Sequence, residues 1–172
     1  LSEYFMPGLG GDALSREHAL ESADALNQIN PDFIRMRALA LPVAAPLTTQ
    51  FEAGEFDKMG EVATARELLL FLESLQGITS KVRSDHVLNL FSEVNGTLPA
   101  DQQKMIDPLR RFLELDAREQ MIFCIGRRTH RLSRLKDLNK PELRDPVAQM
   151  CDEHGATEDT MDQIRHSLRQ RL

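Results

Sequence analysis

Four polar side chains that could do chemistry lie within six positions of one another in SKVRSDHVLNLFSEVNGTLP (80–99): Ser84, Asp85, His86 and Asn89. Asp85 and His86 are a candidate acid–base pair, because histidine titrates near neutral pH. If a strand ends here, Ser84 and His86 share one face, as a serine–histidine nucleophile pair requires, and Asp85 faces away. No nucleophile elbow occurs elsewhere in the sequence. The residues alone therefore favour a polar turn over an active-site rim.

Two arginines alternate with apolar residues in DFIRMRALAL (32–41). This period of two predicts a strand with Arg35 and Arg37 on one face and Ile34 and Met36 on the other. Two guanidinium groups one pleat repeat apart would clamp a carboxylate or phosphate if that face lined a cavity. On an exposed sheet face they would be solvated. The pattern favours neither alternative.

A glycine segment, MPGLGGD (6–12), lies between a predicted strand and a predicted helix. Backbone amides and a helix N-terminus at such a turn suit a phosphate or a carboxylate, which makes Gly8 and Gly10 candidate binding residues. The dinucleotide-binding spacing G-x-G-x-x-G is absent. The residues alone favour a tight turn with glycine at positive φ.

A basic run extends over 127–140 and suggests an acidic partner as an alternative function. Its members are Arg127, Arg128, Arg131, Arg134, Lys136 and Lys140. Such a run is more often a solvated helix end that complements the helix dipole. It lacks interleaved aromatic residues, and the chain has a net charge of −6 and a pI of about 5.4, so the sequence does not predict a nucleic-acid partner.

The elements that position these residues are predicted to alternate between strands and helices. The expected order is a strand over 3–8, a helix begun by Ser15 and stopped at Pro31, a strand over 32–41, a helix over 58–75 and a strand over 78–84. A β-α-β-α-β order predicts a parallel sheet. Residues 99–172 are predicted to form a helical extension to the α/β portion over 1–98.

Within the helical extension, the sequence predicts where several helices begin and end. Pro108 is expected near the start of one helix, Asp116 and Glu119 form a capping-box pattern at the next, and Gly126 is expected to end it. The last helix is predicted from about residue 157, with an apolar stripe that consists of Met161, Ile164 and Leu168.

The composition is that of a globular domain, with 172 residues, 41% hydrophobic and 28% charged. Cys124 and Cys151 have no metal-ligand spacing, so no metal site is predicted within this chain. No apolar run is long enough to span a membrane and no secretory signal is present, which predicts a cytoplasmic protein without a membrane partner. The sequence enters a predicted strand at once, from which we expect a piece of a longer protein.

Several segments resemble the C-terminal half of radical S-adenosylmethionine enzymes, in the subgroup with elongator-like and coproporphyrinogen-oxidase-like barrels. They are YFMPGLGGDALSREHALESADALNQINPDFIRMRALAL, FEAGEF, SDHVLNLFSEVNGTLPADQQKMI and FCIGRRTHRLSRLKDL. The resemblance covers 3–138 and is closest to an uncharacterised bacterial branch. It depends on the order and spacing of these segments. LPVAAPLTT departs from the usual Pro-Gly-Thr-Pro-Leu-Tyr pattern and keeps only Pro46 and Leu47 of its last part.

The resemblance implies a fold and a chemistry. The fold is a partial (β/α) barrel of the TIM type followed by C-terminal helices. In the family, a four-iron four-sulfur cluster held by CxxxCxxC cleaves S-adenosylmethionine to a 5′-deoxyadenosyl radical, which abstracts hydrogen from a substrate. This sequence contains no CxxxCxxC. The chain is therefore similar to the back half of such an enzyme. We expect it to be inactive alone and to need the missing N-terminal half of the barrel as a partner.

The resemblance also assigns roles to the glycine segment and the arginine strand. It places Met6, Gly8 and Gly10 against the adenosine part of the cofactor. It turns Arg35 and Arg37 into the barrel lumen, where Arg37 would hold the methionine carboxylate or the substrate.

The polar cluster after the next strand then becomes the rim of the site, since active sites of such barrels gather at the carboxyl ends of strands. In this interpretation Asp85 and His86 are catalytic. Ser84 and Asn89 line the pocket of a substrate that remains unknown.

Overall fold

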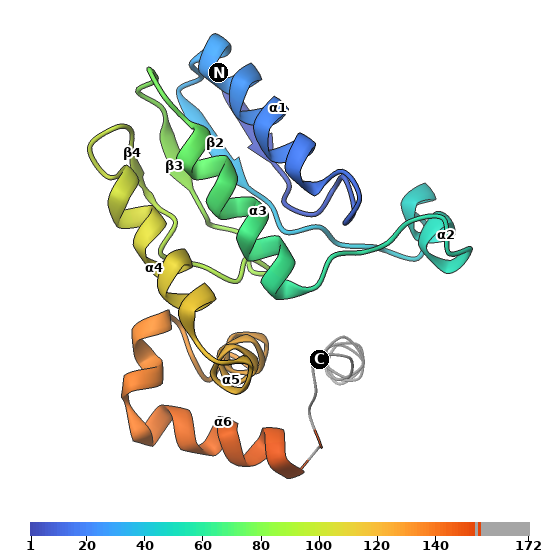
Figure 1. The fold of residues 1–172 in the computed structure, drawn as a ribbon, viewed down its shortest axis with the longest axis vertical. Helices are drawn as coiled ribbons and strands as arrows, with labels where there is room; N and C mark the ends of the chain where they lie inside the picture. The colour runs from blue at the N-terminus through green and yellow to red at the C-terminus, as the bar shows by residue number, and fades with distance from the viewer. Residues whose placement is uncertain (154, 156–172) are drawn as a thin grey trace.

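The computed structural model of this chain describes residues 1–153 and 155, in which strands with intervening helices are followed by helices alone (Figure 1). In chain order the elements are β1 (Ser2–Phe5), α1 (Ser15–Ile29), β2 (Phe33–Met36), α2 (Pro46–Glu52), α3 (Glu61–Ser74), β3 (Lys81–Arg83), β4 (Gly96–Thr97), α4 (Gln102–Glu114), α5 (Ala117–Arg128), the 3-10 helix η1 (Leu135–Asn139) and α6 (Pro141–Glu153). The predicted helix from residue 157, with its apolar stripe, lies outside the described residues.

The sheet is four-stranded in the order β1-β2-β3-β4. β1, β2 and β3 are parallel, with Tyr4 opposite Arg35 and Arg35 opposite Arg83. The short β4 pairs with β3 in the antiparallel sense and forms the border of the sheet away from β1. The fold is therefore α/β with a mostly parallel sheet. The sheet does not close into a barrel within the described residues.

One face of the sheet is covered by α1 and α3, which lie side by side across the strands (Figure 1). Ile34, Met36 and Val82 point to this face and are almost completely buried, which confirms the predicted alternation along the second strand. The Phe5 ring stacks on the Phe71 ring of α3 with 3.7 Å between the ring centroids. Each such side chain contributes about 1.5–3 kcal/mol through removal of apolar surface from water.

The opposite face, here called the open face, carries aromatic and cationic side chains. It is formed by Tyr4, Phe33, Arg35, Arg37, Lys81 and Arg83. Tyr4 is 60% exposed. The guanidinium of Arg37 lies 5.2 Å from the centroid of the Tyr4 ring, and that of Arg35 lies 5.8 Å from the centroid of the Phe33 ring. These cation–π contacts order long side chains on a water-exposed surface.

The strands are shorter than the sequence predicts. β1 ends at Phe5 and β2 at Met36, because loop contacts replace strand pairing beyond these residues. The Ala38 N–H donates to the side chain of Asn89 instead of to a neighbouring strand. The sequence predicts Ser15 as the residue that caps α1, but the N-cap is Leu14 and Ser15 is the first residue of the helix. α2 lies in a segment that the sequence indicates only as a connection.

The helical extension confirms some of the predicted boundaries and corrects others. Asp116 caps α5, and its Oδ1 accepts the Glu119 N–H at 2.9 Å. Pro108 lies in the middle of α4, not near its start. Gly126 does not end α5, which continues to Arg128. A side chain at Gly126 would clash, since its Cβ would lie 2.5 Å from Leu132 atoms, so this glycine allows close packing inside a helix.

No helix in the described part of the chain is long and apolar enough to cross a membrane.

Candidate functional site

The loops that follow β2 and β3 are joined at the carboxyl ends of the strands by the side chain of Asn89. Its Oδ1 accepts the Ala38 N–H at 2.9 Å. Its Nδ2 donates to the Met36 carbonyl and to Ser84 Oγ, both at 3.0 Å. Asn89 is buried, so these partners satisfy an amide that water does not reach. The structure thus uses Asn89, which the resemblance assigns to the substrate pocket, to connect two loops.

Ser84 is also committed to internal hydrogen bonds. Its Oγ donates to the Phe91 carbonyl at 2.7 Å and accepts from Asn89. Its backbone N–H donates to Asn95 Oδ1 at 3.1 Å. The strand ends at Arg83, so Ser84 lies in the following loop. These contacts do not assemble the serine–histidine pair that an alternating strand would place on one face.

Asp85 lies between the two arginines of the open face. Its Oδ2 accepts from Arg35 Nη1 at 2.6 Å and its Oδ1 from Arg37 Nη1 at 2.7 Å. The hydrogen bond from Arg37 holds the pKa of the Asp85 carboxyl below its ordinary value of 3.8, and it raises the pKa of the Arg37 guanidinium. The two arginines share one face, as predicted. With Asp85 they form a cluster with one excess positive charge.

We expect the Arg37→Ala variant to raise the pKa of Asp85 toward 3.8. In the wild type the lowered pKa means that the ion pair stabilises the fold above the unfolded-state pKa. This contribution is lost as the pH falls through the folded-state value. A pH titration of the Asp85 carboxyl carbon by NMR measures the midpoint. An Arg83→Ala variant, on the same face, is the control, and an unchanged midpoint in Arg37→Ala would contradict the assignment.

His86, which directly follows Asp85 in the loop after β3, is half-buried. Its Nδ1 is buried and has no hydrogen-bond partner within the described residues. A buried polar atom without a partner costs about 1–3 kcal/mol, so a group that reached it would gain free energy. In the predicted cluster, Ser84 and Asn89 connect loops and Asp85 pairs with the two arginines, whereas the Nδ1 of His86 has no such partner among the described residues.

The glycine turn after β1 is supported by an internal anion. Gly8 adopts a φ of +86°, and its N–H donates to Glu67 Oε1 at 3.1 Å. Ser15 Oγ donates to Glu67 Oε2 at 2.9 Å, and His18 Nδ1 lies 2.7 Å from Glu67 Oε1. The positive φ of Gly8 agrees with the tight turn that the residues alone favour, and a fully buried carboxylate of α3 accepts the hydrogen bond from its N–H. Met6 and Gly10 belong to the same turn.

Glu67 was not identified as a site residue from the sequence, although a signal for it exists. It lies beside Leu68 and four positions before Phe71, which are both buried on α3. A carboxylate in an apolar stripe needs hydrogen-bond donors from another element. The pattern therefore indicates a polar partner for α3, but it does not indicate which segment supplies the donors.

Two arginines at the end of α5 hold the loop that contains Asn89. Arg127 donates to the carbonyls of Leu90 and Asn89, at 2.7 and 3.0 Å. Arg128 donates to the carbonyl of Leu88 at 2.6 Å and to Glu61. Burial lowers the pKa of Arg127.

The predicted acidic-partner surface would use Arg127, Arg128 and Arg131. The first two donate hydrogen bonds to carbonyls of this loop, whereas Arg131 is exposed.

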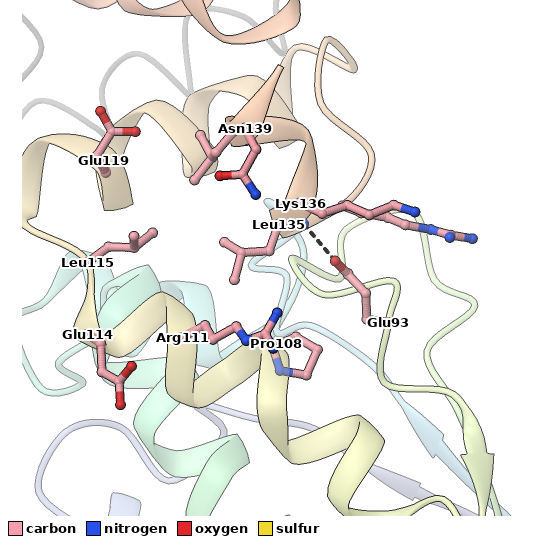
Figure 2. Close-up of a pocket in the computed structure, with 11 residues that line it drawn as sticks. Glu93, Pro108, Arg111, Glu114, Leu115, Glu119, Leu135, Lys136 and Asn139 are labelled. Carbon is pink, nitrogen blue, oxygen red and sulfur yellow. Dashed lines mark hydrogen bonds between the residues drawn. The ribbon is translucent and has the colours of Figure 1, made fainter. Parts of the chain in front are cut away.

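A cavity of about 550 Å³ lies between α4, the start of α5 and η1 (Figure 2). Leu115 and Leu135 form part of its apolar wall. Glu93 reaches it from the loop after β3, and its Oε1 accepts the Leu135 N–H. Arg111 and Glu114 also line it, so its charge selects neither an anion nor a cation. No sequence pattern predicted this cavity.

Among the described residues no group of three metal-ligating side chains occurs. Cys124 and Cys151 are both buried and not disulfide-bonded, and burial raises the pKa of the Cys151 thiol.

Comparison with known protein families, curated proteins and solved structures finds no match to this chain.

Proposed function

We propose that this chain forms one wall of the active site of a radical S-adenosylmethionine enzyme. The observation that carries the proposal is the open face, because Arg35 and Arg37 project from the side of a parallel sheet that no described helix covers. In a (β/α) barrel the helices lie outside and the opposite sheet face lines the lumen. The Arg35–Asp85–Arg37 cluster lies toward the carboxyl ends of the strands, where barrel active sites are found.

The residues of the open face fit part of the cofactor. The excess positive charge of the arginine cluster suits the methionine carboxylate, and charge-assisted hydrogen bonds from guanidinium groups suit its geometry. Two small cavities between the strand ends and the helices measure about 40 and 30 Å³. These volumes are too small to enclose a nucleoside, which would therefore lie outside them, against the turn over 6–11 to which the resemblance assigns it.

The iron–sulfur cluster requires three closely spaced cysteines that this sequence does not contain, so the missing part of the barrel would supply them. When bound, the cluster and S-adenosylmethionine supply the radical that abstracts hydrogen from the substrate. The residues of this chain would hold the carboxylate of the cofactor and place the Asp85–His86 loop beside the substrate.

The decisive experiment uses the intact protein, with the residues encoded upstream of Leu1. After anaerobic reconstitution with iron and sulfide, we expect an iron–sulfur absorption band and release of 5′-deoxyadenosine from S-adenosylmethionine. The same protein with the upstream cysteines replaced by alanine should release none. An upstream sequence without three closely spaced cysteines, or a reconstituted protein that leaves S-adenosylmethionine intact, would exclude the proposal.

Within this proposal, the Arg37→Ala variant of the intact protein should raise the KM for S-adenosylmethionine by roughly 10-fold, which corresponds to the loss of one charge-assisted hydrogen bond. The matched control is Lys81→Ala. Lys81 also lies on the open face, but at the start of β3. A KM that is the same for both variants would show that Arg37 does not hold the cofactor.

A further inference from the structure

Glu67 ties together both ends of the glycine turn after β1. Its Oε1 accepts from Gly8, in the turn itself, and lies 2.7 Å from His18 Nδ1. Its Oε2 accepts from Ser15, the first residue of α1. One side chain of α3 therefore fixes the turn with respect to the helix that follows it.

The turn and the carboxylate depend on each other. A carboxylate that is fully buried is stable only when hydrogen-bond donors surround it, and here Gly8, Ser15 and His18 are those donors. Gly8 has a φ of +86°, and because glycine has no side chain, no packing of its own holds the backbone in this conformation. The hydrogen bond to Glu67 restrains this peptide group.

His18 adds a second restraint, because its ring stacks on Phe5, the last residue of β1. The ring centroids are 5.1 Å apart. Through His18, the strand that precedes the turn packs against the helix that follows it, and the same ring contacts Glu67.

We propose that Glu67 is a positioning residue that holds the turn over 6–11 in the conformation that receives the adenosine part of the cofactor. This inference rests on the proposed function. Glu67 itself does not touch the cofactor, because its side chain is fully buried and both of its oxygens are engaged with the turn and α1. It acts through the backbone of Gly8.

The first test is amide hydrogen exchange of Gly8, followed by NMR in the chain itself. Glu67→Ala should speed exchange by roughly 10- to 100-fold, since it removes a hydrogen bond to a charged acceptor. Glu67→Gln should restore part of the protection, because its amide keeps an acceptor for Gly8. The control is Glu73→Gln, on the same helix, whose carboxylate pairs with Arg110 at 2.6 Å. It should leave Gly8 unchanged.

If Glu67→Ala does not fold, Ser15→Ala removes one donor at the helix end and should give a smaller increase in exchange. Unchanged exchange of Gly8 in the folded variants would overturn the positioning role, whatever the cofactor is.

The second test measures binding of S-adenosylmethionine to the reconstituted intact protein. We expect a Kd about 10-fold higher for Glu67→Ala, with partial recovery in Glu67→Gln. Faster exchange at Gly8 with an unaltered Kd would overturn the inference and leave the proposed function standing. A wild-type protein that neither binds nor cleaves S-adenosylmethionine would remove both.

Discussion

Replacement of Asn89 by alanine is expected to lower the free energy of unfolding by about 3–4 kcal/mol. The substitution removes two buried hydrogen bonds, to Met36 and Ser84, and a partly buried one, from Ala38. Each buried group left without a partner costs about 1–3 kcal/mol, partly offset by relaxation of the loops. Urea unfolding followed by circular dichroism measures the change. The exposed Asn139 offers a matched control, whose replacement by alanine should change the free energy by less than about 0.5 kcal/mol.

An Asn89→Asp variant separates hydrogen bonding from packing. Aspartate has nearly the same shape and keeps an acceptor for the Ala38 N–H, but it cannot donate to the Met36 carbonyl. We expect it to be destabilised almost as much as Asn89→Ala. Wild-type stability of Asn89→Asp would show that the amide donors do not hold the two loops together.

The Arg127→Met variant is expected to lose about 2–3 kcal/mol of unfolding free energy. Methionine keeps the apolar stem but leaves the carbonyls of Leu90 and Asn89 without their donors. The same substitution at the exposed Arg131 should have little effect, as is usual at the surface. The difference between the two midpoints of urea unfolding is the measurement.

This comparison also bears on the alternative function. If the basic segment binds an acidic partner, Arg131→Met should weaken that binding while stability is unchanged. If Arg127 is structural, its replacement should destabilise the chain in the absence of any partner. Equal stability of the two variants would contradict the structural role of Arg127.

The order of strands and helices was predictable because local patterns encode it. Period-two alternation identified Ile34 and Met36 as the residues that face the helices, and helices were predicted in the segments that form α1 and α3. These patterns depend only on neighbouring positions. The strand ends were harder to predict from the sequence, because they depend on contacts between distant residues, such as Ala38 with Asn89.

The candidate site was predictable only in part, for the same reason. The shared face of Arg35 and Arg37 follows from alternation, but their partner Asp85 comes from a loop 48 or more positions away. The hydrogen bond between Glu67 and Gly8 and the one between Arg127 and the Leu90 carbonyl also join residues that are distant in the sequence. A charged residue gives the same local signal whether it faces water or a buried backbone group.

The antiparallel β4 gives the sheet two unlike borders, and this limits how an enclosed chamber can be completed. A further strand that runs in the common direction and pairs in the parallel sense with its neighbour can be added only beside β1. A second copy of the chain that is related by a two-fold axis cannot supply it. Two-fold symmetry across β1 either reverses the strand direction or moves the helices to the opposite side of the sheet. A parallel continuation of the sheet beside β1 therefore cannot come from a two-fold dimer of this chain, and in the proposed enzyme a segment of different sequence would supply it.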